Sequence, residues 1–200
     1  TGEKFRETEE FQAYIVPIVQ KFFKEDNVSI YSLKDIWKAL PQGVQKKMEN
    51  QLFEYFFKEQ YNAKYLWENT KENVQKSMLT KLINKAEKDY IGQDDIRTYK
   101  DILVQIWSGL STNLQNNNEE LFDKIFEAVK DESWKCSEFW EKTKQQEKFF
   151  EKIYTKMLLE ADVEQYDREI EIYSIWKSTN EELQKKYLNK IFRDFPKDKE

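Results

Sequence analysis

The sequence contains no histidine, and this absence removes much of the usual chemistry of enzymes. Ser-His-Asp and Cys-His nucleophile activation, the commonest general base, and zinc sites with imidazole ligands all need histidine. The single cysteine, Cys136, can form neither an internal disulfide nor a thiolate zinc site. We therefore expect a protein that is not an enzyme and has no cofactor and no metal. Cys136 itself is predicted to be a small, buried apolar residue.

Glycine and proline are scarce as well, with four and three residues, respectively, in a chain of 200. A β-rich fold needs many tight turns, and those turns are built largely from these two residue types. The glycines, at positions 2, 43, 92 and 109, are too far apart to form a phosphate-binding loop. The composition therefore predicts an all-α fold made of helices with few connections.

The chain also lacks a long hydrophobic run and an excess of basic residues. No stretch approaches the roughly 18 apolar residues of a membrane-spanning helix. Nucleic-acid binding depends largely on phosphate neutralisation, and here 33 Lys and Arg face 38 Asp and Glu, for a net charge of −5. This balance disfavours a nucleic-acid partner and favours a solvated helical surface. The lone cysteine fits a reducing compartment, so we predict an intracellular, cytoplasmic protein; the first residue, Thr1, favours an excised or processed chain.

What the chain does contain is a recurrent pair of residues, Trp and Gln. Four Trp residues are each followed by a Gln eight residues later. Trp140 is followed by Gln146 six residues later. The pairs are Trp37 and Gln45, Trp67 and Gln75, Trp107 and Gln115, Trp140 and Gln146, and Trp176 and Gln184. A large apolar residue precedes each Trp: Ile36, Leu66, Ile106, Phe139 and Ile175. This pattern predicts that a first helix ends just before each Trp.

A second helix is predicted after each Gln by apolar residues at fixed offsets. Seven positions after Gln stand Leu52, Leu82, Phe122, Ile153 and Ile191, and eleven positions after it stand Phe56, Ala86, Phe126, Met157 and Phe195. These offsets close about two and three turns, so the side chains share one helix face. Gln12, followed by Val19 and Phe23 at the same offsets, marks a further copy that has only its second helix.

The predicted organisation is a single domain, 1–200, with one N-terminal helix and about five quasi-repeated antiparallel helix pairs. The units span about 7–25, 30–59, 62–89, 95–130, 133–160 and 164–195. Turn residues separate the two helices of a pair. Among these we predict Thr70 with Asn73, and Thr179 with Glu182, as helix N-caps.

The recurring residues have a structural interpretation and a functional one. We favour packing between units for the Trp residues over an aromatic ligand cage. The Gln residues are interpreted as structural hydrogen-bonding groups near the start of each second helix, and the alternative is a ladder that contacts a bound chain. Trp134 follows none of these registers and is the one weak candidate for an exposed binding residue.

Unit length and the helix-pair pattern resemble those of HEAT and tetratricopeptide solenoids over nearly the whole chain. The units lack the small-residue pattern of tetratricopeptide repeats and the mid-helix proline of HEAT units. We therefore expect either an α-solenoid or a compact bundle of the same helices. The expected function is a protein-protein interaction or scaffold module with another protein as partner. The alternatives are an RNA-binding helical array and a structural fragment of a larger solenoid.

Overall fold

The computed structural model describes residues 8–24, 29–91, 95–129, 132–144, 146–147, 150, 177 and 179–194. The side chains of residues 60, 61, 133, 134 and 189–194 are outside this description. Regular structure in these residues is helical throughout, and they contain no strand. The prediction of an all-α fold is therefore confirmed. The predicted units 133–160 and 164–195 lie partly outside the described residues.

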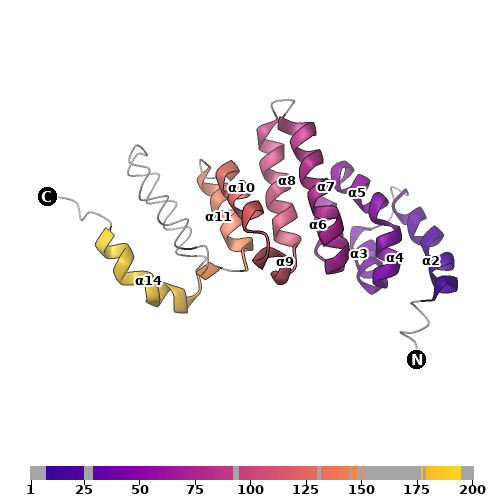
Figure 1. The fold of residues 1–200 in the computed structure, drawn as a ribbon, viewed down its shortest axis with the longest axis horizontal. Helices are drawn as coiled ribbons and strands as arrows, with labels where there is room; N and C mark the ends of the chain where they lie inside the picture. The colour runs from indigo at the N-terminus through magenta and orange to yellow at the C-terminus, as the bar shows by residue number, and fades with distance from the viewer. Residues whose placement is uncertain are drawn as a thin grey trace. The chain divides into compact units, whose positions relative to one another are not determined.

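The chain divides into two compact units, Thr1–Leu114 and Gln115–Glu200, which are described separately. The first unit holds α2 (Glu9–Phe22), α3 (Ile30–Ala39), α4 (Gln42–Lys47), α5 (Glu49–Lys58), α6 (Gln60–Trp67), α7 (Glu72–Tyr90) and α8 (Ile96–Gly109) (Figure 1). The short helix α9 (Thr112–Asn116) runs across the division. The second unit holds α10 (Glu119–Val129), α11 (Ser133–Lys142) and α14 (Glu181–Asp194). A single domain stays a prediction.

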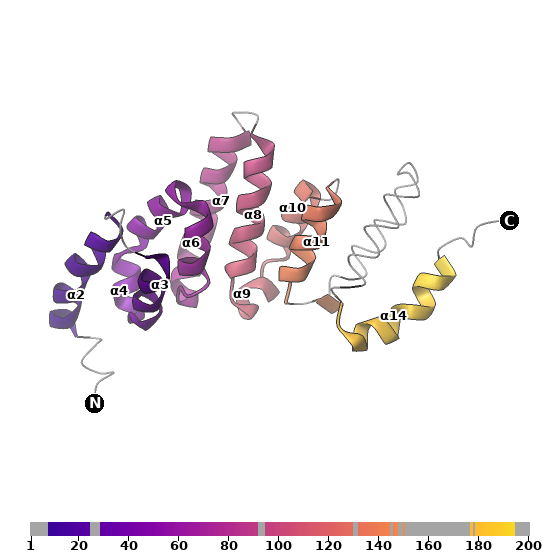
Figure 2. The ribbon, with the colours of Figure 1, turned by 180° about the vertical axis from the view of Figure 1, so that it is seen from behind.

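Helices of the first unit pack in two rows. In one row α6 contacts α3 on one side and α8 on the other, and in the second row α4 contacts both α2 and α7. The chain passes from the second row to the first through the hairpins α5–α6 and α7–α8, whose helices pack together (Figure 2). In the second unit, α10 packs on α11.

Helix α7 shows how the sequence pattern produces this packing. Val74, Met78, Leu82 and Ala86 recur at four-residue spacing and are completely buried. This spacing places them along one side of the helix, where they remove apolar surface from water. The next helix, α8, begins where the Asp95 carboxylate accepts a hydrogen bond from the backbone N–H of Thr98, a regular N-cap.

The first helices end later than the sequence predicts. We expected an end before each Trp, but α3, α8 and α11 continue two residues past it, to Ala39, Gly109 and Lys142, and α6 ends at Trp67 itself. The indole is thus part of the last helical turn. Two of the second helices are also divided, at Met48 between α4 and α5 and at residues 117–118 between α9 and α10.

Candidate functional site

The structure places most of the recurring Trp and Gln residues in the interior. Trp37, Trp67, Trp107 and Trp140 are fully buried. The buried glutamines are Gln12, Gln45, Gln75 and Gln115, whereas Gln146 and Gln184 are partly exposed. Trp176 and the side chain of Trp134 lie outside the described residues. Cys136 is buried, as predicted.

Gln75 joins the ends of two first helices through its side-chain amide. Its Nε2 donates to the carbonyl of Trp67 at 2.8 Å and to the carbonyl of Gly109 at 2.7 Å. Its Oε1 accepts from the backbone N–H of Ser111 at 3.2 Å. We call this set of three hydrogen bonds the glutamine bridge. Carbonyls at a helix C-terminus lack intrahelical donors, and the bridge supplies them.

The same bonds occur one helix pair earlier. Gln45 Nε2 donates to the carbonyls of Trp37 at 2.8 Å and Asn69 at 3.2 Å, and its Oε1 accepts from the N–H of Lys71 at 2.7 Å. Asn69 and Lys71 stand two and four residues after Trp67, just as Gly109 and Ser111 stand two and four after Trp107. The bridge is therefore defined by fixed offsets from two successive Trp residues.

Within the second unit, Gln115 follows the same rule. It donates to the carbonyl of Lys142 at 3.4 Å and accepts from the N–H of Lys144 at 2.9 Å, and these residues stand two and four after Trp140. The bond to Lys142 is long, so the bond to Lys144 is the stronger of the two.

At Gln12 the sequence changes the arrangement. The residue four after Trp37 is Pro41, which has no N–H to donate to a glutamine oxygen. The Gln12 Nε2 lies close to Gly43, where an added Cβ would meet it at 2.9 Å. The bridge seen at Gln45 and Gln75 therefore needs a residue other than proline at the fourth position after Trp.

The tryptophan indoles also reach into the next helix pair. Trp37 Nε1 donates to Thr70 Oγ1 at 3.0 Å, and that hydroxyl donates to the carbonyl of Leu66 at 2.8 Å. Trp67 Nε1 donates directly to the carbonyl of Ile106 at 2.8 Å. Leu66 and Ile106 each stand immediately before a Trp. Both indoles therefore hydrogen-bond toward the carbonyl at this position, Trp37 through the Thr70 hydroxyl and Trp67 directly.

These bonds correct the predicted helix caps. The Thr70 side chain caps no helix, because it is buried at 7% exposure and bonded to Trp37 and Leu66; Lys71 occupies the N-cap position of α7. At α14 the cap is Asn180, whose Oδ1 accepts from the N–H of Leu183 at 3.0 Å. Both threonines stand three residues after a Trp, and this shared position is the signal that sequence analysis missed.

Gly109 lies in close contact with the Trp67 indole. A Cβ built at Gly109 would come within 2.2 Å of Trp67 Cδ1. No side chain fits there, since real Cβ contacts are essentially never below 3.0 Å. The absent side chain allows α8 to approach α6 and brings the carbonyl of Gly109 to Gln75.

A charged cluster stabilises the outer side of α4, α5 and α7. Glu49 accepts hydrogen bonds from Lys46, from Lys81 at 2.7 Å and from Ser77 at 2.8 Å. Burial alone would raise the pKa of Glu49, but these three donors outweigh it and lower that pKa to about 2. The carboxylate is thus held ionised between two helices.

A second carboxylate connects α7 to the turn after α8. Glu72 accepts from Ser111 Oγ at 2.7 Å and from Asn113 Nδ2 at 2.6 Å. These two hydrogen bonds lower the pKa of Glu72 from its ordinary value. The turn that receives the glutamine bridge is therefore held from its exposed side as well.

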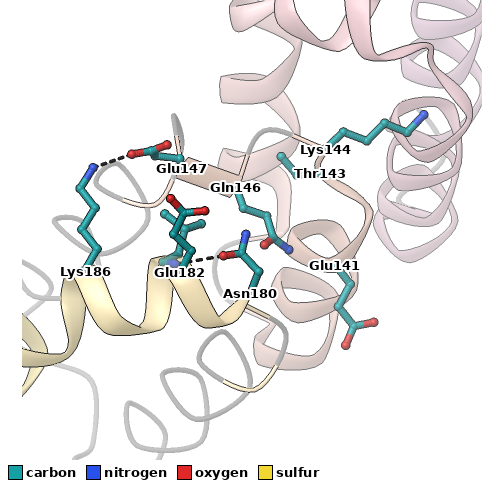
Figure 3. Close-up of a pocket in the computed structure, with 9 residues that line it drawn as sticks. Glu141, Thr143, Lys144, Gln146, Glu147, Asn180, Glu182 and Lys186 are labelled. Atoms are coloured by element: carbon teal, nitrogen blue, oxygen red, sulfur yellow. Dashed lines mark hydrogen bonds and ion pairs between the residues drawn. The ribbon is translucent and has the colours of Figure 1, made fainter.

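A polar cleft of about 520 Å³ lies within the second unit, between the end of α11 and the start of α14 (Figure 3). Its rim carries Glu141, Glu147 and Glu182 beside Lys144 and Lys186. Lys186 donates to Glu147 at 2.5 Å, and this bond raises the pKa of the Lys186 ammonium. A cleft lined by both carboxylates and ammonium groups can bind charged groups of either sign.

Gln146 lines the same cleft as Asn180. Asn180 stands four residues after Trp176, as Lys71, Ser111 and Lys144 stand four after their own Trp residues. Gln146 and the residue four after the following Trp thus line one cleft.

Large apolar side chains at the surface are few among the described residues, and one of them, Tyr31, packs on another aromatic ring. Tyr31, 63% exposed, lies 6.1 Å from the ring of Tyr65, and the Lys64 ammonium lies over Tyr65 at 5.1 Å. Tyr31 stands six residues before Trp37, the offset that Trp134 has from Trp140. The side chain of Trp134 lies outside the described residues, so its role as an exposed binding residue stays a prediction.

In the part of the chain that the structure describes, no group of His, Cys, Asp and Glu side chains could hold a metal ion. None of the helices searched there is both long and apolar enough to cross a membrane. No protein-family model matches the chain, and comparison with curated proteins and with solved structures finds no match.

Proposed function

We propose that the chain is a non-enzymatic protein-protein interaction or scaffold module built from helical-hairpin repeats that stack as an α-solenoid. The observation that carries this proposal is the glutamine bridge. Gln45 and Gln75 join different helix pairs with the same three bonds, made to positions at the same offsets. Identical junctions between successive pairs are the geometric condition for a stack, because each unit then contacts its neighbours in the same way.

The residue type at one exposed position varies from unit to unit, and this variation supports the same proposal. Each of the six register glutamines is followed by an exposed residue: Ala13, Lys46, Lys76, Asn116, Glu147 and Lys185. A constant glutamine, buried in four of the six copies, thus stands beside an outer position that is apolar, basic, polar or acidic. Stacked helix pairs use this freedom to shape an extended surface for a partner.

The test is capture of partners by the tagged chain of 200 residues, quantified by mass spectrometry. The matched control carries Gln75→Ala, which breaks one junction and leaves every exposed residue in place. A partner that wild type enriches and the control does not supports binding by the assembled surface. Absence of any enriched protein across native extracts and salt conditions would contradict the proposal. If the chain is retained on immobilised RNA and this retention falls steeply with salt concentration, an RNA-binding function would replace the proposed protein-protein interaction.

A further inference from the structure

A groove of about 370 Å³ lies between the end of α2 and α5, within the first unit. Its aromatic lining is formed by Phe23, directly after α2, and by Tyr55 of α5, whose rings meet edge to face with centroids 5.4 Å apart. Phe23 also packs edge to face on the buried indole of Trp37, at 5.8 Å. Phe23 and Tyr55 are both partly exposed, so the groove presents aromatic surface to solvent.

One polar atom of the groove lining lacks a hydrogen-bond partner. Gln51 stands one turn before Tyr55 on α5, and its Oε1 is buried, yet no partner for this oxygen lies among the described residues. In the glutamine bridges, by contrast, Gln45 Oε1 and Gln75 Oε1 each accept a hydrogen bond from a backbone N–H. A buried acceptor without a donor is unfavourable. Gln51 Oε1 therefore marks a position where the donor of a ligand would be stabilised.

Size and charge restrict what can occupy the groove. Ligand pockets usually measure about 300–1,000 Å³, so this groove lies at the small end and accommodates one large side chain and not a whole helix. Its rim carries two exposed lysines, Lys24 and Lys58, and one exposed acid, Glu54. Two ammonium groups beside one carboxylate disfavour an arginine or lysine side chain as the occupant. They favour acidic residues next to it.

The chemistry of the lining then selects the type of side chain. Leucine, isoleucine, methionine and phenylalanine would cover the two rings but bring no donor to Gln51 Oε1. Serine, asparagine and glutamine would bring a donor but little apolar surface. Tyrosine and tryptophan supply both a ring for edge-to-face contact and an O–H or N–H donor. These two residue types are also enriched among those that carry most of the binding energy of protein interfaces.

We propose that the groove binds a tyrosine or tryptophan side chain from an acidic segment of a partner protein. The ring packs against Phe23 and Tyr55, and its O–H or N–H donates to Gln51 Oε1. The neighbouring acidic residues lie near Lys24 and Lys58, so salt weakens the binding. This inference rests on the proposed function, since it names the chemistry of the partner.

The first experiment compares blocked acidic pentapeptides that differ only in the central residue, which is tyrosine, tryptophan or phenylalanine. Their binding to the chain of 200 residues is measured by NMR, from the backbone amides of α5 and the side-chain amide of Gln51. We expect the tyrosine and tryptophan peptides to bind about 3- to 10-fold more tightly than the phenylalanine peptide, which leaves the buried oxygen unpaired. Equal binding of all three peptides, or binding by none of them, overturns the proposal.

Two pairs of substitutions test the groove in the protein itself. Gln51→Leu removes the acceptor, so the tyrosine and phenylalanine peptides should then bind equally; Gln42→Leu, at an exposed position outside the groove, should preserve the difference between them. Lys24→Glu should weaken binding of the tyrosine peptide and reduce its dependence on salt. Lys21→Glu, exposed on α2 but outside the groove lining, should have a clearly smaller effect. Equal effects within either pair would contradict the proposed contacts.

The melting temperature of Gln51→Leu provides a readout that does not depend on binding. It should not fall, because the lost oxygen has no partner among the described residues. A clear fall would mean that this amide is bonded within the fold, and would overturn the proposal.

The other occupants are distinguishable. Light scattering on the chain alone tests for a second copy, and a dimer that Gln51→Leu dissociates would overturn the assignment to a partner protein. Failure of all the peptides excludes the groove as a binding site but leaves the proposed function standing, because capture of partners tests that function separately.

Discussion

At Gln75, one side chain satisfies three backbone groups of two helix ends. Replacing it by alanine leaves the carbonyl of Gly109 and the N–H of Ser111 without this amide and removes one bond to the Trp67 carbonyl. Each buried group that loses its partner costs about 1–3 kcal/mol. We predict that Gln75→Ala lowers the free energy of unfolding by about 2–4 kcal/mol, measured by urea denaturation.

The control for this prediction is Gln42→Ala. Gln42 is exposed and makes one bond of 3.3 Å, from Asn73, so its replacement should change the free energy of unfolding by less than about 0.5 kcal/mol. Equal effects of the two substitutions would show that the bridge contributes little to stability.

The ionised state of Glu49 makes stability depend on pH. Its pKa is about 2 in the folded chain and near 4.5 otherwise, so its contribution is complete above about pH 4.5 and is lost as the pH falls toward 2. The exposed ends of Lys46 and Lys81 reduce the effect, and we expect about 1–2 kcal/mol. The difference in unfolding free energy between wild type and Glu49→Gln should therefore be constant from pH 7 to 5 and shrink between pH 4.5 and 3. A difference that grows on acidification would contradict this assignment.

At the scale of elements, the approach of α8 to α6 depends on Gly109. The Cβ of an alanine there would overlap the Trp67 indole, which is fixed by its bond to Ile106 and cannot move aside cheaply. Overpacking of this kind costs about 1–3 kcal/mol. We predict a melting temperature lower by about 2–12 °C for Gly109→Ala. Gly43→Ala, whose close contact is the flexible end of Gln12, should have a clearly smaller effect; similar losses would contradict the argument.

The sequence was sufficient to predict helices, because helical periodicity is strong in stretches such as Val74 to Ala86. It was insufficient for the ends of the first helices, where we expected a stop before Trp and the helix continues through it. The reason is that the indole packs as part of the last turn, which residue type alone does not reveal. The divisions at Met48 and at residues 117–118 carry no proline or glycine signal either.

The hydrogen bonds of the candidate site were less accessible to sequence analysis. A glutamine at a fixed distance from Trp indicated a recurring role but not its partners, which belong to the turn of another helix pair 24 to 36 residues away. Thr70 was interpreted as a cap because threonine commonly caps helices. The structure shows a different use of its hydroxyl, between Trp37 Nε1 and the Leu66 carbonyl, for which the position three residues after Trp67 was the only sequence signal.

For the whole molecule, the proposed stack has a consequence that scattering can measure. A compact domain of 200 residues has a radius of gyration of about 16–17 Å. Helix pairs joined one after another by the same bridge extend in one direction, since every junction repeats the same displacement. We therefore predict a monomer whose radius of gyration by small-angle X-ray scattering clearly exceeds this value. A monomer of about 16–17 Å would mean that the helices close into a bundle, and the bridges between Gln45, Gln75 and the following turns would then stabilise a closed core.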